Sequence, residues 1–437
     1  MLDGWSTMEA AAPAASPLVA LPPDVLAVLL APLPALSLAR LRGACRLLRS
    51  AASTAAAARF AALRPPSAAF DRPAAAAGEE SAVAYEEGCA QWLHALEGRC
   101  GRELAIGGFD TTRMPAGGFD TPDDDMHDAE GCLSSLEHLW LLPEGTVPAA
   151  DPAGSDDPLD PPPLTTQRTD LGAVALPGGW VFAIGGRCGA EDHDTVERFD
   201  AARGSWTAVE PMLQPLSGLS AARLGRDRLL VAGGACRASY RSTSLVQIYS
   251  ARDDSWSIAA DMSQFRVFSA AVAASPTQVV VLGGASRAGA SMGSFQGSHS
   301  YDPRIVEVYD GESDRWSPGP RLEAARYGCA AATAPSGRII VVGGLSQDEP
   351  IQRSEGVDLR TASISALAPL PSPDARELWG AAALGTPAGV ACIGGAVSAE
   401  SSARVWLYDE RADRWEAGTG MATARWCGAA ARIVGRE

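Results

Sequence analysis

The chain has 437 residues, of which 46% are hydrophobic and 20% charged, and this balance predicts a globular protein with at least one large core. Acids outnumber basic residues by 52 to 36, for a formal net charge of −16, which argues against nucleic acid or an anionic lipid surface as the partner. The nine cysteines form no Cys-x-x-Cys pair, so neither a disulfide framework nor a zinc site is predicted. No apolar run reaches the ~18 to 20 residues that span a bilayer.

The first 63 residues divide into an N-terminus, residues 1–20, which we expect to be disordered, and a helical segment, residues 21–63. Asp24 can cap a helix that carries Val25, Leu26, Leu29 and Leu33. A second apolar face at helical spacing follows, made of Leu38, Leu41, Cys45 and Leu48. The segment therefore predicts a small helical hairpin with an exposed apolar surface.

The order of residues in this segment resembles an F-box, whose motif begins Leu-Pro-x-Asp/Glu-x-Leu and continues through Leu-Pro and Cys-Arg. The matching positions are Leu21, Pro22, Asp24, Leu26, Leu33, Pro34, Leu38, Leu41 and Cys45. The resemblance implies docking on the Skp-type adaptor of a cullin ubiquitin ligase. One departure is Leu48, which stands where the family has tryptophan. Two alternatives stay open: an organellar transit peptide, because residues 40–64 are rich in Arg, Ala and Ser and contain no acid, or an ordinary helical cap.

Residues 64–84 are rich in Pro and Ala and predict a semi-rigid linker before a domain at 85–437. In that domain a Gly-Gly pair after a short apolar strand recurs six times, ending at Gly108, Gly186, Gly234, Gly284, Gly344 and Gly395. From the second pair onward the spacings are 48, 50, 60 and 51 residues, and the first interval is 78. A period near 50 residues indicates repeated β units, with an insertion in the first.

Four of these repeats carry an aromatic residue at a strand end and a tryptophan seven positions later: Phe199 and Trp206, Tyr249 and Trp256, Tyr309 and Trp316, Tyr408 and Trp415. The combination resembles kelch repeats and implies an all-β fold, a six-bladed kelch β-propeller with four strands to a blade. In the fifth repeat we expect Leu359 at the Tyr position, with no tryptophan after it. Residues 421–434 match the opening strand of a repeat, so we expect the C-terminus to complete the first blade.

An arginine opens the strand that leads to the next Gly-Gly in five repeats, at Arg168, Arg266, Arg326, Arg376 and Arg425, and Leu216 takes its place once. Sixfold repetition predicts a ring of side chains around one axis. Kelch domains that bind acidic peptides carry arginines here, so the resemblance implies an acidic or phosphorylated ligand held by guanidinium groups. The alternative is structural: each arginine bonds carbonyls of a neighbouring strand or pairs with a nearby acid.

The segments between these motifs predict an insertion at 109–135, which contains the acidic run Asp123–Asp128, and loops at 143–166 and 285–304. The acidic run lacks the glycine and the terminal glutamate of an EF-hand loop, so we expect a solvated insertion without a metal ion. None of the five histidines stands at ligand spacing from Cys or acids. We therefore expect no cofactor and no catalytic site.

Together these features predict a non-catalytic substrate-recognition subunit of a cullin-type ubiquitin ligase, which holds a target protein on its propeller in the cytoplasm or nucleus. A kelch interaction scaffold unrelated to ubiquitin, cytoskeletal or organellar, is the first alternative. A galactose oxidase-like propeller enzyme is the second.

Overall fold

The computed structural model describes residues 102–107, 132–139 and 162–433, apart from positions 202, 237–240, 287–301, 347–348, 372–377, 398–399 and 422. All of these belong to one of the chain's two compact units, Arg99–Glu437. Their regular structure is β throughout, and no helix among them is long and apolar enough to cross a membrane.

Twenty strands form five four-stranded antiparallel sheets, which we number as blades I to V. Blade I comprises β3 Gly172–Leu176, β4 Trp180–Ile184, β7 Val196–Asp200 and β8 Ser205–Val209. Blade II comprises β9 Ser220–Leu224, β10 Arg228–Ala232, β13 Val246–Ser250 and β14 Ser255–Ala259. Blade III comprises β15 Val267–Ala273, β16 Gln278–Ala285, β17 Val306–Asp310 and β18 Arg315–Pro318.

Blade IV comprises β19 Ala330–Thr333, β20 Ile339–Val342, β23 Ser354–Asp358 and β24 Ser363–Leu367. Blade V comprises β25 Ala382–Gly385, β26 Gly389–Ile393, β29 Val405–Asp409 and β30 Arg414–Ala417. Short two-stranded ribbons follow four of the Gly-Gly pairs: β5 Arg187–Cys188 with β6 Glu191–Asp192, β11 Ala235–Cys236 with β12 Arg241–Ser242, β21 Leu345–Ser346 with β22 Glu349–Pro350, and β27 Ala396–Val397 with β28 Glu400–Ser401.

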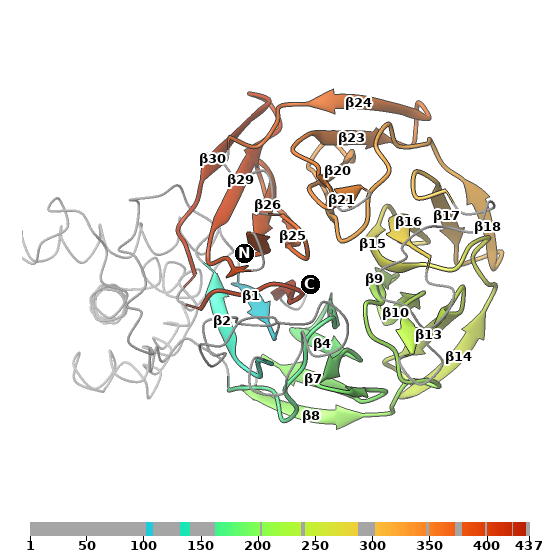
Figure 1. Cartoon of the computed structure of the whole chain (residues 1–437). Coiled ribbons are helices and arrows are strands. Elements are labelled where there is room, and N and C mark those ends of the chain that lie inside the picture. The colour runs from blue at the N-terminus through green and yellow to red at the C-terminus, as the bar shows by residue number, and fades with distance from the viewer. Residues whose placement is uncertain are drawn as a thin grey trace, which may run out of the picture. The chain divides into compact units, whose positions relative to one another are not determined.

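The blades are arranged in a ring, with inner strands such as β9, β15 and β25 near the centre and β8, β14, β18, β24 and β30 on the perimeter (Figure 1). The second strand of each blade is buried almost throughout, as in β20 and β26, because neighbouring blades cover both of its faces. The perimeter strands β8 and β14 are largely exposed. Continuous apolar second strands and alternating outer ones are the pattern that this arrangement requires.

A closing sheet joins the two ends of the ring. β1 Arg102–Ile106 pairs with β2 Leu136–Leu139 on one side and with β31 Ala429–Ile433, near the C-terminus, on the other. One apolar cluster joins this sheet to blade I and includes Ile106 and Val181. Another joins it to blade V and includes Ala105 and Ile393. The prediction that a C-terminal strand completes the first repeat is confirmed.

The prediction of six four-stranded blades is not met. The structure has five blades, and the closing sheet has three strands in the part of the chain that is described. The difference falls in the repeat that the first Gly-Gly interval of 78 residues already marked as interrupted.

Candidate functional site

A closed ring of six backbone hydrogen bonds surrounds the axis, at the ends of the inner strands. Each member's N–H donates to the carbonyl of the member in the neighbouring sheet, over 2.7 to 3.0 Å, through Asp170, Gly218, Phe268, Gly328, Gly380 and Cys427. All six have φ between 49° and 65°, a left-handed conformation that glycine adopts readily and that a bulky residue such as phenylalanine adopts at a cost. We call this set the axial ring.

Four of the five predicted arginines lie two residues before members of the axial ring and are buried inside the sheets. Arg168, Arg266 and Arg326 are 0% exposed and Arg425 is 3% exposed. Each donates from Nη1 to the carbonyl of the first glycine in a Gly-Gly pair, as Arg266 does to Gly283 at 2.7 Å. The first three also pair with a buried glutamate of the same blade: Glu197, Glu307 and Glu355.

These contacts match the alternative in which each arginine bonds backbone carbonyls or pairs with a nearby acid. The guanidinium of Arg168 is held by the Gly185 carbonyl at 2.8 Å, the Thr195 carbonyl at 2.9 Å and the Glu197 carboxylate at 2.8 Å. Burial lowers the pKa of Arg168, and the charge of Glu197 opposes that change. Binding of an acidic ligand by these arginines stays a prediction, and the burial of their side chains does not support it.

In blade V the hydrogen bonds place Leu378, and not the predicted Arg376, at the arginine position. The second glycine of each pair donates its N–H to the carbonyl at the arginine position, as Gly284 does to Arg326, and in blade V the carbonyl that Gly344 reaches is that of Leu378. Gly380 of the axial ring is likewise two residues after Leu378, not after Arg376. The assignment of Arg376 to this position was therefore wrong, and Arg376 itself lies outside the described residues.

Where leucine replaces arginine, the glutamate is replaced as well. Leu216 in blade II is matched by Gln247 at the position of Glu197, and Leu378 in blade V is matched by Trp406. Leu378 and Trp406 belong to one apolar cluster. A lone buried carboxylate would cost several kcal/mol, so the loss of both charges together keeps these blades neutral inside.

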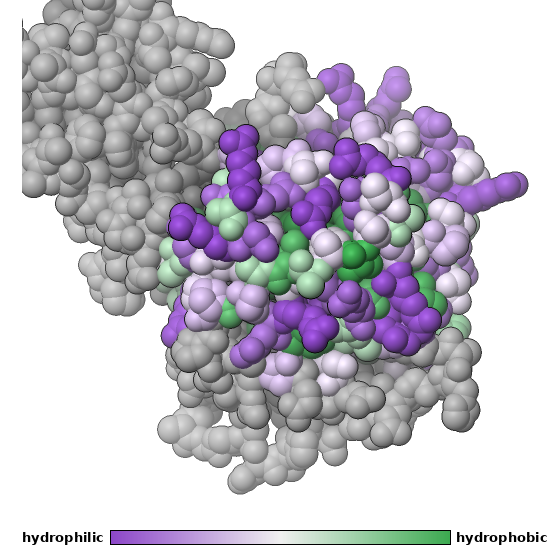
Figure 2. All heavy atoms as spheres, turned by 90° about the horizontal axis from the view of Figure 1, so that it is seen from above, coloured by the Kyte–Doolittle hydropathy of each residue, from purple (hydrophilic) through white to green (hydrophobic). Residues whose placement is uncertain are grey.

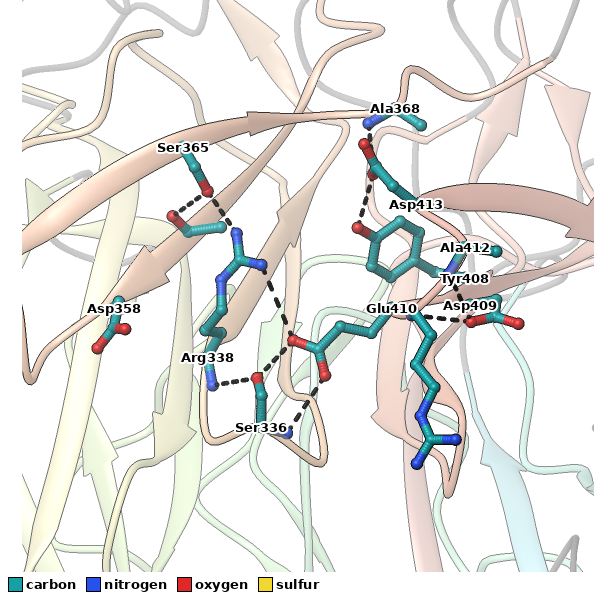
Figure 3. Close-up of polar contacts among 12 residues, drawn as sticks. Ser336, Arg338, Asp358, Ser365, Ala368, Tyr408, Asp409, Glu410, Ala412 and Asp413 are labelled. Carbon is teal, nitrogen blue, oxygen red and sulfur yellow. Dashed lines mark hydrogen bonds and ion pairs between the residues drawn. The ribbon is translucent and has the colours of Figure 1, made fainter.

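Neighbouring blades are joined on their outer side by a repeated clamp. The tyrosine hydroxyl and a main-chain N–H of the preceding blade both donate to one aspartate oxygen, as Tyr408 and Ala368 do to Asp413 at 2.8 and 2.9 Å (Figure 3). The tryptophan seven residues after the aromatic position then donates its Nε1–H back to a carbonyl of the preceding segment, as Trp415 does to Ala368 at 3.1 Å. The predicted aromatic pairs are confirmed as cross-strand partners: Phe199 with Trp206, Tyr249 with Trp256, Tyr309 with Trp316 and Tyr408 with Trp415.

Blade IV has lost this clamp. Its cross-strand pair is Val357 with Ile364, so the tyrosine position is Val357 and the expectation for Leu359 was wrong. Ala362, with φ 50°, takes the place of the aspartate, and Pro320, which has no N–H, stands where Ala260 and Ala368 donate in other blades. The main-chain N–H donor and the carboxylate acceptor of the clamp are therefore both absent from this junction.

The next junction, between blades IV and V, carries extra polar contacts. The Ser336 N–H donates to Oε2 of Glu410 at 3.2 Å, and the Ser336 hydroxyl bonds the same carboxylate (Figure 3). Nη1 of Arg338 lies 4.0 Å from Oε1 of Glu410, and Arg338 also donates to the Ser365 hydroxyl of its own blade (Figure 3). On the edge of the ring where β24 lies, hydrophobic residues are visible between hydrophilic ones (Figure 2).

Aromatic side chains gather on one side of the axial ring, a feature that the sequence analysis missed. Ring centroids of Phe268 and Trp379 are 6.1 Å apart, and those of Trp379 and Trp426 are 4.4 Å apart. Tyr327 packs with Phe268 and Trp379 in one apolar cluster. We call Phe268, Tyr327, Trp379 and Trp426 the axial aromatic cluster. Its signal in the sequence was an aromatic residue one or two positions after the arginine position.

Three thiols lie beside this cluster. Cys132, Cys188 and Cys427 pack with Trp379 and Trp426. Burial, followed by a hydrogen bond with Cys188, raises the pKa of Cys132 to about 12, and burial raises the pKa of Cys427. The thiols of Cys132 and Cys427 therefore stay protonated near neutral pH and are poor nucleophiles. His193 is partly buried. Burial lowers its pKa, and the positive charge of Arg168 lowers it further.

The remaining predicted site lies outside the described residues. It comprises the adaptor-binding positions Leu21, Pro22, Asp24, Leu26, Leu33, Pro34, Leu38, Leu41 and Cys45. The predicted acidic run at Asp123–Asp128 also lies outside them.

Comparison with known proteins agrees with the repeats. The kelch motif family matches residues 171–213, which begin at blade I and end beyond β8. Kelch repeat and BTB domain-containing protein 12 of Danio rerio is 26% identical over 195 residues, 41% of this chain and 30% of that protein. Kelch repeat and BTB domain-containing protein 2 of Homo sapiens is 30% identical over 173 residues, 37% of this chain and 25% of that protein.

Kelch-like protein 35 of Mus musculus is 28% identical over 171 residues, 39% of this chain and 26% of that protein. The matched region spans less than a third of the length of each of these relatives. Together with the ring of antiparallel blades, the Gly-Gly pairs and the aromatic partners, these matches support the presence of kelch repeats in this chain.

Proposed function

We propose that this chain is a non-catalytic substrate-recognition subunit of a cullin-type ubiquitin ligase, working in the cytoplasm or nucleus. Residues 21–63 hold a Skp-type adaptor, and the propeller holds a target protein. Such a subunit contributes proximity and orientation to the transfer of ubiquitin and no bond chemistry of its own.

The observation that carries the protein-binding part is a set of exposed apolar side chains on the propeller. Leu213 and Phe265 are 52% and 57% exposed, and they lie in the segments that lead into Gly218 and Phe268 of that ring. Phe268 and Trp379 are themselves partly exposed. Exposed aromatic and aliphatic side chains on a rigid scaffold are typical of protein interfaces.

We also infer that the closing sheet is the sixth blade of the ring. The support is the axial ring, in which each blade contributes one hydrogen-bonded member and the closing sheet contributes Cys427.

Co-expression with a Skp-type adaptor and its cullin tests the ligase role. The full chain should co-purify with both, and a chain without residues 21–63 should not. A Leu213→Asp, Phe265→Asp variant is the matched control: it should keep the adaptor and lose the target. If the full chain does not retain the adaptor, the ligase role is wrong and the scaffold alternative takes its place.

A further inference from the structure

The accessible part of the axial aromatic cluster consists of Phe268 and Trp379. Both are partly exposed, whereas Trp426 is 2% exposed and packs against Trp379, at 4.4 Å between ring centroids. An indole packed in this way keeps its orientation, and its exposed part can contact a partner. The π face of tryptophan attracts cations more strongly than that of tyrosine or phenylalanine.

A carboxylate borders this aromatic surface. Cys188 of β5 packs against the cluster that contains Trp379 and Trp426, and Glu191 of β6 is the cross-strand partner of Cys188. Residues directly opposite in an antiparallel pair project from the same face of the ribbon. Glu191 is exposed and therefore lies on the face of the ribbon that borders the aromatic cluster.

The basic side chain of the same ribbon is already engaged. Arg187 is 7% exposed, and its Nε bonds Oδ2 of Asp170 at 3.0 Å. The arginines that would attract an acidic ligand are also internal, since Arg168, Arg266 and Arg326 are fully buried against carbonyls and glutamates. The described surface near the axis therefore offers aromatic side chains and Glu191 on the ribbon β5–β6. The equivalent ribbon β11–β12 carries the exposed Arg241 opposite Cys236, so Glu191 marks the side of the cluster that suits a cation.

We propose that this surface binds a lysine or arginine side chain from a basic segment of the partner protein, with the cation over Trp379 and next to the Glu191 carboxylate. The proposal rests on the protein-binding function above and names the chemistry of its partner. The chain itself contains the same kind of contact, since Cζ of Arg198 lies 4.7 Å from the ring centroid of Trp180. The formal net charge of −16 also favours the approach of a basic partner.

The test is binding of short lysine- and arginine-rich peptides to the full chain, compared with peptides that carry glutamate and aspartate at the same positions. The basic peptides should bind and the acidic ones should not. Trp379→Leu should weaken binding about 5-fold, the value expected for a partly exposed cation–π contact, and Trp379→Phe should retain most of it. Glu191→Gln should weaken binding about 2-fold, as expected for an exposed ion pair.

Trp379→Leu is the deciding variant, because it changes no charge. General attraction to an acidic chain would also favour basic peptides, but it would be the same in Trp379→Leu as in the parent. Ile258→Ala, on the perimeter strand β14, is the control and should change nothing. Equal binding by the parent and Trp379→Leu, tighter binding of acidic peptides, or no binding of either set would overturn the proposal. The loss of target binding in Leu213→Asp, Phe265→Asp would still stand as separate evidence for protein binding.

Discussion

The hydroxyl of Tyr249 donates a 2.6 Å hydrogen bond to Oδ1 of Asp254, five residues later in the turn between β13 and β14. The same oxygen accepts the N–H of Glu210, at the end of blade I, at 3.0 Å. A single carboxylate thus fixes its own hairpin and ties it to the preceding blade. Asp314 and Asp413 repeat the arrangement in blades III and V.

Replacing the clamp aspartate should loosen one junction. Asp314→Ala removes the acceptor for Tyr309 and for the Ala260 N–H and should lower the free energy of unfolding by about 1 to 3 kcal/mol. The matched control is Ala362→Asp in blade IV, where Val357 has no hydroxyl and Pro320 no N–H, so stability should change by less than about 0.5 kcal/mol. Urea unfolding measures both, and equal effects would contradict the clamp.

The clamps should also make stability depend on acid pH. The Tyr249 hydroxyl and then the Glu210 N–H hold the pKa of Asp254 below its ordinary value. Because the folded pKa is the lower one, the stabilising contribution is present above the unfolded pKa, near 4, and is lost as pH falls through the folded value. The pKa of Tyr249 is raised, so its ionisation does not enter this range. Thermal melting as a function of pH should show a smaller loss of stability below about pH 4 in Asp254→Asn than in the parent.

The buried arginine and glutamate should be replaceable only as a pair. Arg326→Leu alone leaves Glu355, which is 0% exposed, without its cation and should cost about 3 to 5 kcal/mol. The double change Arg326→Leu, Glu355→Gln imitates Leu216 and Gln247. Its glutamine oxygen can still accept one of the two N–H groups, of Glu323 and Ala324, that Glu355 accepts, as the Gln247 oxygen accepts that of Leu213. The double variant should therefore be more stable than the single one, and a purely additive mutant cycle would disprove the coupling.

The axial ring should be intolerant of a side chain at its glycines. A Cβ at Gly328 would lie 2.4 Å from Nε1 of Trp379, at φ 61°, so Gly328→Ala should be destabilising through both the clash and the left-handed backbone. Gly204→Ala separates the two causes, because Gly204 has φ 64° and no heavy atom within 4 Å of the added carbon. It should cost about 1 to 2 kcal/mol for the backbone alone, and Gly328→Ala clearly more. Equal melting temperatures would show that the clash is relieved.

Removal of residues 421–437 should abolish cooperative folding. The deletion takes away β31, which pairs with β1 along five residues from Arg102 to Ile106. It also removes the buried Arg425 and Cys427, the member of the axial ring that the closing sheet contributes. The apolar clusters against blades I and V would be opened. Loss of the thermal transition is the expected result, and unchanged melting would show that the ring does not depend on this closure.

Features that depend on short-range spacing could be predicted from the sequence. The Gly-Gly pairs and the aromatic residues seven positions apart lie in hairpins, where the turn length fixes which residues become partners. The expected partners Tyr309 and Trp316 are accordingly paired in the sheet. The likeness of residues 421–434 to an opening strand was enough to predict that the C-terminus closes the first repeat.

The orientation of the arginines and the register of the divergent repeats were decided only by the tertiary structure. Arg326 points inward because a carbonyl at Gly343 and a carboxylate at Glu355 come to it from later strands, and no local pattern indicates that meeting. Leu378 takes the arginine position because Gly344 and Gly328, both from blade IV, bond to that stretch. The kelch repeat and its closure were therefore determined by the sequence itself, whereas the place where this propeller can meet a partner depended on contacts between blades.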